Sequence, residues 1–198
     1  MVILTPVYND WESLGELLRE LAEVKPKEAT WKVYAVNDGS TDLPDRLNVP
    51  AGVSLQILHL SMNMGHQRAI NIGLCYLMES RQDWDSVLIM DSDGEDRPQD
   101  IKALTERYDG KGLVFAERRK RSEGPAFKAF YLVYKAAFKL LTGKAITFGN
   151  FSLVPRTAVK TMVQNADFWN HYPGAVLKSR LPFLSVRTER GIRYAGTR

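Results

Sequence analysis

Short apolar runs alternate with longer periodic segments along the chain. The runs have the length and composition of buried strands, and they cover residues 2–7, 31–36, 53–60, 86–91 and 112–117. Between the first two runs, apolar residues recur every three or four positions, as on one helical face: Leu14, Leu17, Leu18 and Leu21. Similar patterns predict helices over 65–80, 98–108, about 125–142 and from Pro155 onward, and late strands over 147–154 and 182–188.

Strands that alternate with helices predict an α/β fold with a mostly parallel, Rossmann-like central sheet and helices on both faces. The chain has 198 residues, 44% of them hydrophobic, and no repeat or low-complexity linker, which predicts a single domain over 1–198. The single cysteine, Cys75, excludes an internal disulfide, so a reducing compartment is expected. No apolar run approaches the roughly 20 residues of a membrane-spanning helix, and no signal peptide is visible.

Charge divides the chain into two unequal halves. Residues 1–100 hold 8 Lys and Arg against 17 Asp and Glu, whereas residues 101–198 hold 19 against 6. Such asymmetry predicts an acidic half and a basic half with different tasks. The alternative is that both halves present ordinary solvated charge.

Acidic residues follow the fourth predicted strand, at the sheet edge where α/β proteins bind ligands. Asp91, Asp93 and Glu95 alternate, so an extended chain would place all three on one side. Clustered carboxylates repel one another unless a cation joins them, and hard oxygen ligands select Mg²⁺ or Mn²⁺. The alternative is an acidic turn ahead of the helix at Pro98, with Asp96 as its cap.

Two more predicted strands end in polar residues at the same edge, over 5–10 and 36–42, which indicates one shared site. The motifs TPVYNDWESL, VNDGSTD, NMGHQRAINIGL, MDSDGEDRPQDI and GNFSLVPR also follow one another in a familiar order. Their order and approximate spacing resemble family 2 glycosyltransferases of the GT-A fold, in the branch of dolichyl-phosphate mannosyltransferases and bacterial polyprenyl-phosphate glycosyltransferases. The resemblance covers nearly the whole chain.

This resemblance implies a metal-dependent, inverting glycosyltransferase that uses a UDP- or GDP-sugar. It implies that Asp91 and Asp93 form the aspartate pair beside Mg²⁺ or Mn²⁺, and that Glu95 is a further ligand where relatives often carry Gln. The catalytic set would be Asp93, Asp96 and Arg118. The residues implied in nucleotide binding are Pro6, Tyr8, Asp10, Asp38, Gly65, Arg68 and Asp91. His66 stands where relatives commonly carry Lys.

Basic residues cluster in ERRKRSEGPAFK, over 117–128, and again near the end of the chain. In the family, cations near Arg118 contact phosphates of the donor or the acceptor, which implies such a role for Arg119, Arg121 and Lys128. The late segment TERGIRYAGTR resembles a segment that folds over the site, where Arg190 and Arg193 would engage phosphate. Solvated basic loops are the alternative. Nucleic acid is not the expected partner, because the acidic cluster repels a phosphate backbone unless a metal intervenes.

The acceptor decides whether a general base is needed. A lipid phosphate is ionised at neutral pH and attacks without help, whereas a hydroxyl acceptor requires a base, for which Asp96 and His171 are candidates. Asn150 stands where relatives often carry Asp and would contact the acceptor. The helix over 125–142 carries lysines along one face and suits either a membrane surface or an ordinary packed helix.

The function expected from these features is sugar transfer to a polyprenyl- or dolichyl-phosphate-type membrane lipid. Transfer to a hydroxyl of a polysaccharide or lipid-linked glycan is the second reading, and a nucleotidyltransferase, which would release pyrophosphate, is an alternative of another class. A non-catalytic nucleotide-binding module is disfavoured by the intact aspartate pair. Because relatives continue beyond RYAGT, the chain is expected to lack a C-terminal membrane-associated extension and to act at the cytoplasmic face of the membrane, or in the cytoplasm as this fragment. Whether it forms a homo-oligomer is left open.

Overall fold

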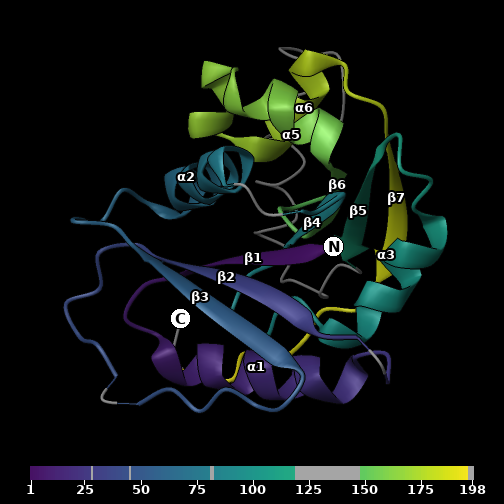
Figure 1. Ribbon diagram of the computed structural model, residues 1–198. Helices are drawn as coiled ribbons and strands as arrows, with labels where there is room; N and C mark the ends of the chain where they lie inside the picture. Colours follow the sequence, from purple (N-terminus) through teal and green to yellow (C-terminus); the bar gives the residue numbers. More distant parts are fainter. Residues whose placement is uncertain (28, 45, 81–82, 119–147, 196–198) are drawn as a thin grey trace, which may run out of the picture.

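The computed structural model describes residues 1–27, 29–44, 46–80, 83–118 and 148–195 (Figure 1). Within these ranges seven strands form one sheet in the order β3-β2-β1-β4-β6-β5-β7. The strands are β1 (Val2–Val7), β2 (Trp31–Asn37), β3 (Val53–His59), β4 (Ser86–Ile89), β5 (Leu113–Arg118), β6 (Ser152–Pro155) and β7 (Phe183–Thr188). Strand β6 runs antiparallel to β4 and β5, and the other pairings are parallel, as the alternating pattern predicted.

Helices cover both faces of the sheet, which confirms the predicted α/β class (Figure 1). One face carries α2 (His66–Glu79), α5 (Arg156–Val163) and α6 (Tyr172–Ser179), and the other carries α1 (Trp11–Val24) and α3 (Ile101–Arg107). Two 3₁₀ turns, η1 (Pro98–Asp100) and η2 (Ala166–Trp169), precede α3 and α6. No helix in the described ranges is long and apolar enough to cross a membrane.

The core forms two layers because side chains alternate across each strand. On β1, Val2 and Leu4 pack toward α2, whereas Ile3 packs toward α1. The four leucines expected on the buried face of α1 are all 0% exposed. Each buried leucine contributes about 1.5–3 kcal/mol relative to an exposed one, so this face is sufficient to hold α1 on the sheet.

Three local predictions were wrong. Strand β4 ends at Ile89 instead of 91, and β6 begins at Ser152 instead of 147, because pairing between these two strands involves only four residues of each. The helix predicted from Pro98 is divided into η1 and α3. The helix expected over 125–142, with its lysines, lies outside the described residues.

Candidate active site

The carboxyl ends of β2, β1 and β4 lie side by side, because these strands are neighbours in the sheet and all parallel. A pocket of about 180 Å³ opens at this edge. Its lining includes Pro6, Tyr8, Asp38 and Gly65, four of the residues predicted to bind the nucleotide, together with Val7, Asn63 and His66. The structure therefore brings these predicted residues together, and binding itself stays a prediction.

Asp38 is a buried carboxylate that shapes the pocket. It is 3% exposed, and its two oxygens accept the backbone N–H groups of Met64 (2.7 Å) and Gly65 (3.0 Å). Gly65 has φ +89°, a conformation that favours glycine. In this structure Asp38 fixes the turn that leads into α2, a role that the sequence did not indicate.

Asn9 also shapes the edge, although the sequence did not single it out. It has φ +50°, and its side-chain oxygen accepts the backbone N–H of Thr41 at 2.9 Å. Its own backbone N–H donates to Ser40 Oγ at 2.9 Å. Its neighbour Asp10, predicted to line the pocket, instead accepts the backbone N–H of Ser13 at 3.3 Å and caps α1.

The acidic loop, residues 91–97, is folded and not extended. Gly94 has φ +88°, and the backbone N–H of Glu95 donates to Asp93 Oδ1 at 3.0 Å. Asp96, 1% exposed, accepts the backbone N–H of Asp91 at 2.8 Å and holds the loop closed. The premise that an extended chain aligns three carboxylates is therefore wrong. The predicted cap is also wrong, because the residue before η1 is Arg97, not Asp96.

The C-terminal strap, residues 189–195, contacts the acidic loop. Arg190 pairs with Glu95 at 2.5 Å, and Arg193 pairs with Asp93 at 2.7 Å and with Glu95 at 3.6 Å. The backbone N–H of Gly191 donates to the carbonyl oxygen of Glu95, and the backbone N–H of Tyr194 donates to that of Asp93, each at 3.0 Å. In this structure both arginines contact carboxylates, and their contact with phosphate stays a prediction.

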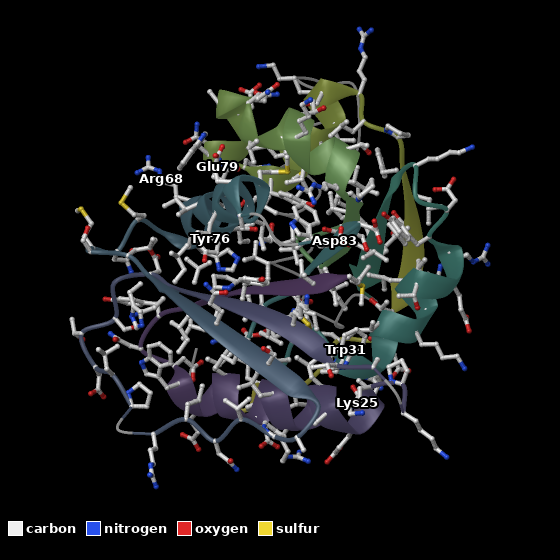
Figure 2. All side chains as sticks on the ribbon, viewed as in Figure 1. Lys25, Trp31, Arg68, Tyr76, Glu79 and Asp83 are labelled. Atoms are coloured by element: carbon white, nitrogen blue, oxygen red, sulfur yellow. The ribbon has the colours of Figure 1, made fainter. Side chains whose placement is uncertain are left out.

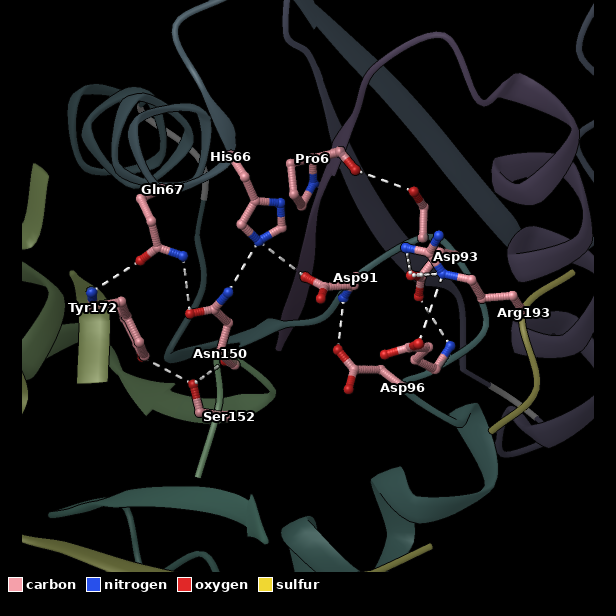
Figure 3. Close-up of polar contacts among 12 residues, drawn as sticks. Pro6, His66, Gln67, Asp91, Asp93, Asp96, Asn150, Ser152, Tyr172 and Arg193 are labelled. Atoms are coloured by element: carbon pink, nitrogen blue, oxygen red, sulfur yellow. Dashed lines mark hydrogen bonds and ion pairs between the residues drawn. The ribbon is translucent and has the colours of Figure 1, made fainter. Parts of the chain in front are cut away.

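A chain of polar groups runs from Asp91 into the helices above the sheet (Figure 3). His66 Nε2 lies 3.2 Å from Asp91 Oδ1 and 2.9 Å from Asn150 Nδ2. Gln67 Nε2 donates to Asn150 Oδ1 at 3.2 Å, and the backbone N–H of Tyr172 donates to Gln67 Oε1 at 2.9 Å. Partial burial lowers the pKa of His66 and the Asp91 carboxylate raises it, with a net increase. Sequence reasoning missed Gln67 because its partners are distant in the chain.

The remaining predicted residues either do not line the pocket or lie outside the described part of the chain. Arg68 points outward from α2 into solvent (Figure 2). His171 caps α6, since its Nδ1 accepts the backbone N–H of Gly174 at 2.9 Å. Arg118 is the last residue of β5, and its side chain is not described. Arg119, Arg121 and Lys128 lie outside the described residues.

The carboxylates of Asp91 and Asp93 suit a hard divalent cation. Both belong to one short loop at the pocket edge, and their side chains are 26% and 18% exposed, while Oδ1 of Asp91 itself is buried. Among the described residues, no three His, Cys, Asp or Glu side chains form a ligand group. As oxygen donors, these two carboxylates match Mg²⁺ or Mn²⁺, which retain waters and bind phosphate, and such an ion on them stays a prediction.

Comparisons with known proteins agree with this geometry. The family model described as "Glycosyl transferase family 2" matches residues 2–162. An uncharacterized glycosyltransferase of Synechocystis sp. is 29% identical over 170 residues, covering 82% of this chain and 52% of the relative. An undecaprenyl-phosphate 4-deoxy-4-formamido-L-arabinose transferase of Salmonella paratyphi A is 28% identical over 151 residues, which cover 73% of this chain and 44% of the relative. The chain thus spans about half the length of the curated relatives it matches.

A solved structure extends the comparison to the fold. Glucosyl-3-phosphoglycerate synthase from Mycobacterium tuberculosis, in complex with Mn²⁺, UDP-glucose and phosphoglyceric acid, superposes with a TM-score of 0.62. It is 13% identical, and the match covers 99% of this chain and 72% of that one. The mostly parallel sheet with helices on both faces is the GT-A fold of such enzymes. The chain belongs to glycosyl transferase family 2.

Proposed function

We propose that this chain transfers a sugar from a nucleotide-diphosphate sugar to a polyprenyl- or dolichyl-phosphate-type lipid. The observation that carries the proposal is the pocket at the ends of β1 and β2, with the aspartates of the acidic loop at its edge. The Salmonella relative named for undecaprenyl phosphate supports a lipid-phosphate acceptor, and the mycobacterial complex supports a UDP-sugar and a divalent cation. The proposed place of action is the cytoplasmic face of the membrane, with residues 1–198 as one domain.

The residues around the pocket divide the work of binding the donor. Tyr8 is 47% exposed, so its ring is available to stack on the base. Asp38 keeps the turn before α2 in place, which holds the pocket open for the nucleoside. Mg²⁺ or Mn²⁺ on Asp91 and Asp93 would supply positive charge for the leaving diphosphate.

Inversion requires a single displacement, in which an acceptor oxygen forms a bond to the anomeric carbon while the bond to the nucleoside diphosphate breaks. An ionised lipid phosphate needs no general base for this step. Both candidates for a base have structural contacts here: Asp96 is buried and bound to the backbone of Asp91, and Nδ1 of His171 caps α6. These contacts favour a phosphate acceptor over a hydroxyl acceptor, which is the second reading.

The donor site is tested by calorimetric titration with nucleoside diphosphates and nucleotide sugars, with and without Mn²⁺. We expect metal-dependent binding of one nucleotide, and a loss of about 100-fold or more in Asp93→Ala, because the neutralising ion is then held by one carboxylate. Asp83→Ala is the matched control, since this exposed aspartate precedes β4 at the opposite sheet edge (Figure 2). A folded wild type that binds none of the ligands would contradict the donor-site assignment.

The acceptor is tested separately, by following release of the nucleoside diphosphate. With the sugar donor identified by calorimetry, we expect release to depend on added polyprenyl phosphate in detergent. The same polyprenol without its phosphate is the control, because it offers only a hydroxyl. Release with the alcohol and not with the phosphate would favour transfer to a hydroxyl.

A further inference from the structure

We propose that Asn9 is a positioning residue for the nucleoside half of the donor, because it fixes the pocket wall that carries Tyr8 against the wall that carries Asp38. The contacts of Asn9 belong to the structure itself, whereas their effect on a nucleotide rests on the proposed function. Asn9 does not line the pocket, and it acts through Tyr8, its neighbour in the chain.

The pocket has two walls that come from neighbouring strand ends. Pro6, Val7 and Tyr8 form the end of β1 and the residue after it, and Asp38 is the first residue after β2. The parallel ladder between these strands ends at the pair Val7 and Asn37, and the backbone N–H of Asp38 then donates to the carbonyl oxygen of Val7 at 2.8 Å. Beyond this bond the spacing of the two walls depends on contacts between the turns.

Asn9 supplies such contacts with both its side chain and its backbone. Its Oδ1 accepts the backbone N–H of Thr41 at 2.9 Å and lies 3.4 Å from the backbone nitrogen of Asp42. Its own backbone N–H donates to Ser40 Oγ at 2.9 Å. Three consecutive residues of the turn after β2 are therefore tied to one residue after β1. These contacts form the Asn9 clamp.

The backbone of Asn9 narrows the choice of residue at this position. Its φ of +50° lies in the left-handed region, which is unfavourable for most side chains and tolerated by Asn and Asp. The clamp also requires a side-chain oxygen that accepts hydrogen bonds. Glycine meets the first requirement alone, whereas aspartate meets both. Substitution by each of them therefore separates the acceptor oxygen from the backbone conformation.

The clamp acts on Tyr8 because it holds the chain on both sides of that residue. Val7 precedes Tyr8 and is bonded to Asp38, and Asn9 follows Tyr8 and is bonded to the turn after β2. The ring of Tyr8 remains 47% exposed. An exposed ring on a fixed backbone loses less conformational freedom when it stacks on a base than a ring on a mobile turn, so the clamp raises the affinity for the nucleoside.

Two other bonds between the same turns are independent of the Asn9 side chain. Trp11 Nε1 donates to the carbonyl oxygen of Asp42 at 2.6 Å, and the bond from Asp38 to Val7 continues the sheet. We therefore expect Asn9→Gly to remain folded, with a looser turn after β2. Thermal unfolding and amide spectra of the variant check this expectation.

The inference is tested by calorimetric titration with UDP and with GDP, in the presence of Mn²⁺. We expect Asn9→Gly to bind the preferred nucleotide about tenfold more weakly, which is the scale of one hydrogen bond to the protein. Asn9→Asp should restore the affinity to within about threefold of the wild type, since it keeps the acceptor oxygen. Asn48→Gly is the matched control, because Asn48 is exposed in the same connection between β2 and β3 and does not line the pocket.

A double-mutant cycle decides whether Asn9 acts through Tyr8. If the clamp positions that ring, Asn9→Gly should lower the affinity by no more than about twofold in a Tyr8→Ala background. A merely structural role would give the same loss in both backgrounds. Ser40→Ala is an independent variant, because it removes the acceptor of the Asn9 N–H and leaves β1 unchanged. We expect it to weaken binding by about threefold.

Three results would overturn the inference: wild-type affinity in Asn9→Gly, no recovery in Asn9→Asp, or an equal loss with and without the ring of Tyr8. If Asn9→Gly does not fold, wild-type affinity in Ser40→Ala would overturn it. A folded wild type that binds neither UDP nor GDP would instead refute the proposed function and the nucleotide part of the inference together, and the Asn9 clamp would then be a feature of the fold alone.

Discussion

The contact between the C-terminal strap and the acidic loop depends on glycine at position 191. A Cβ atom added there would lie 1.9 Å from the carbonyl oxygen of Gly94, a backbone atom that no rotamer change can move. The approach is close from both sides, because the Cβ position of Gly94 itself is 2.7 Å from the carbonyl oxygen of Ile192 in the strap. We therefore expect Gly191→Ala to detach the strap while the sheet remains intact.

The size of the effect follows from the contacts that are lost. The strap makes two backbone hydrogen bonds to the loop, worth about 0.5–1.5 kcal/mol each, and its ion pairs contribute at most about 1 kcal/mol each at this exposure. The docking free energy is thus about 1–5 kcal/mol, with a central value of about 3 kcal/mol. Because 1 kcal/mol shifts the Tm of a chain of this size by about 2–4 °C, the central value corresponds to a fall in Tm of roughly 6–12 °C.

Hydrogen exchange and limited trypsin digestion measure the detachment directly. In Gly191→Ala we expect faster exchange over 91–97 and 189–195, and faster cleavage after Arg190 and Arg193. Gly149→Ala is the control, because a Cβ at that position meets no atom of the described residues within 4 Å. If Gly191→Ala kept wild-type protection in the strap and a Tm within about 1 °C of the control, the steric argument would be refuted.

Three further predictions concern single side chains. Burial raises the pKa of Asp100, whose Oδ2 has no hydrogen-bond partner among the described residues. The ionised form therefore costs stability: Asp100→Asn should raise the Tm at neutral pH, and the difference should vanish in thermal scans as the pH falls and the wild type protonates. Phe115→Ala should lower the free energy of unfolding, measured in urea, by about 3–5 kcal/mol, because the ring of Phe115 is 0% exposed and its centroid lies 4.0 Å from that of Phe148. A variant as stable as the wild type would contradict this packing. Arg193→Gln should tighten Mn²⁺ binding by about tenfold in calorimetry without nucleotide, because Arg193 no longer competes for Asp93, and an unchanged affinity would show that the ion pair does not compete.

The sequence alone determined the class of fold and the sheet edge at which the candidate site lies. Strand β1 was predicted with its observed ends, and the leucine face of α1 was predicted residue by residue, because local periodicity records which side of an element is buried. Parallel strands then bring their carboxyl ends to one edge, which was enough to place Tyr8, Asp38 and Asp91 together.

Tertiary structure decided how the site residues are used. The turn at Gly94 accompanies a divergence in which Asp91 contacts His66 and Asp93 contacts Arg193. Alternation along an extended strand would instead have placed both side chains on one side. Helix α6 escaped prediction because its cap is His171, an uncommon capping residue.

The polar chain through Gln67 joins groups separated by 83 and 105 positions in the sequence. Local pattern fixes burial and backbone geometry, whereas such long-range pairings depend on how helices pack over the sheet. Only the folded chain therefore determines which atom of each amide or ring donates and which accepts.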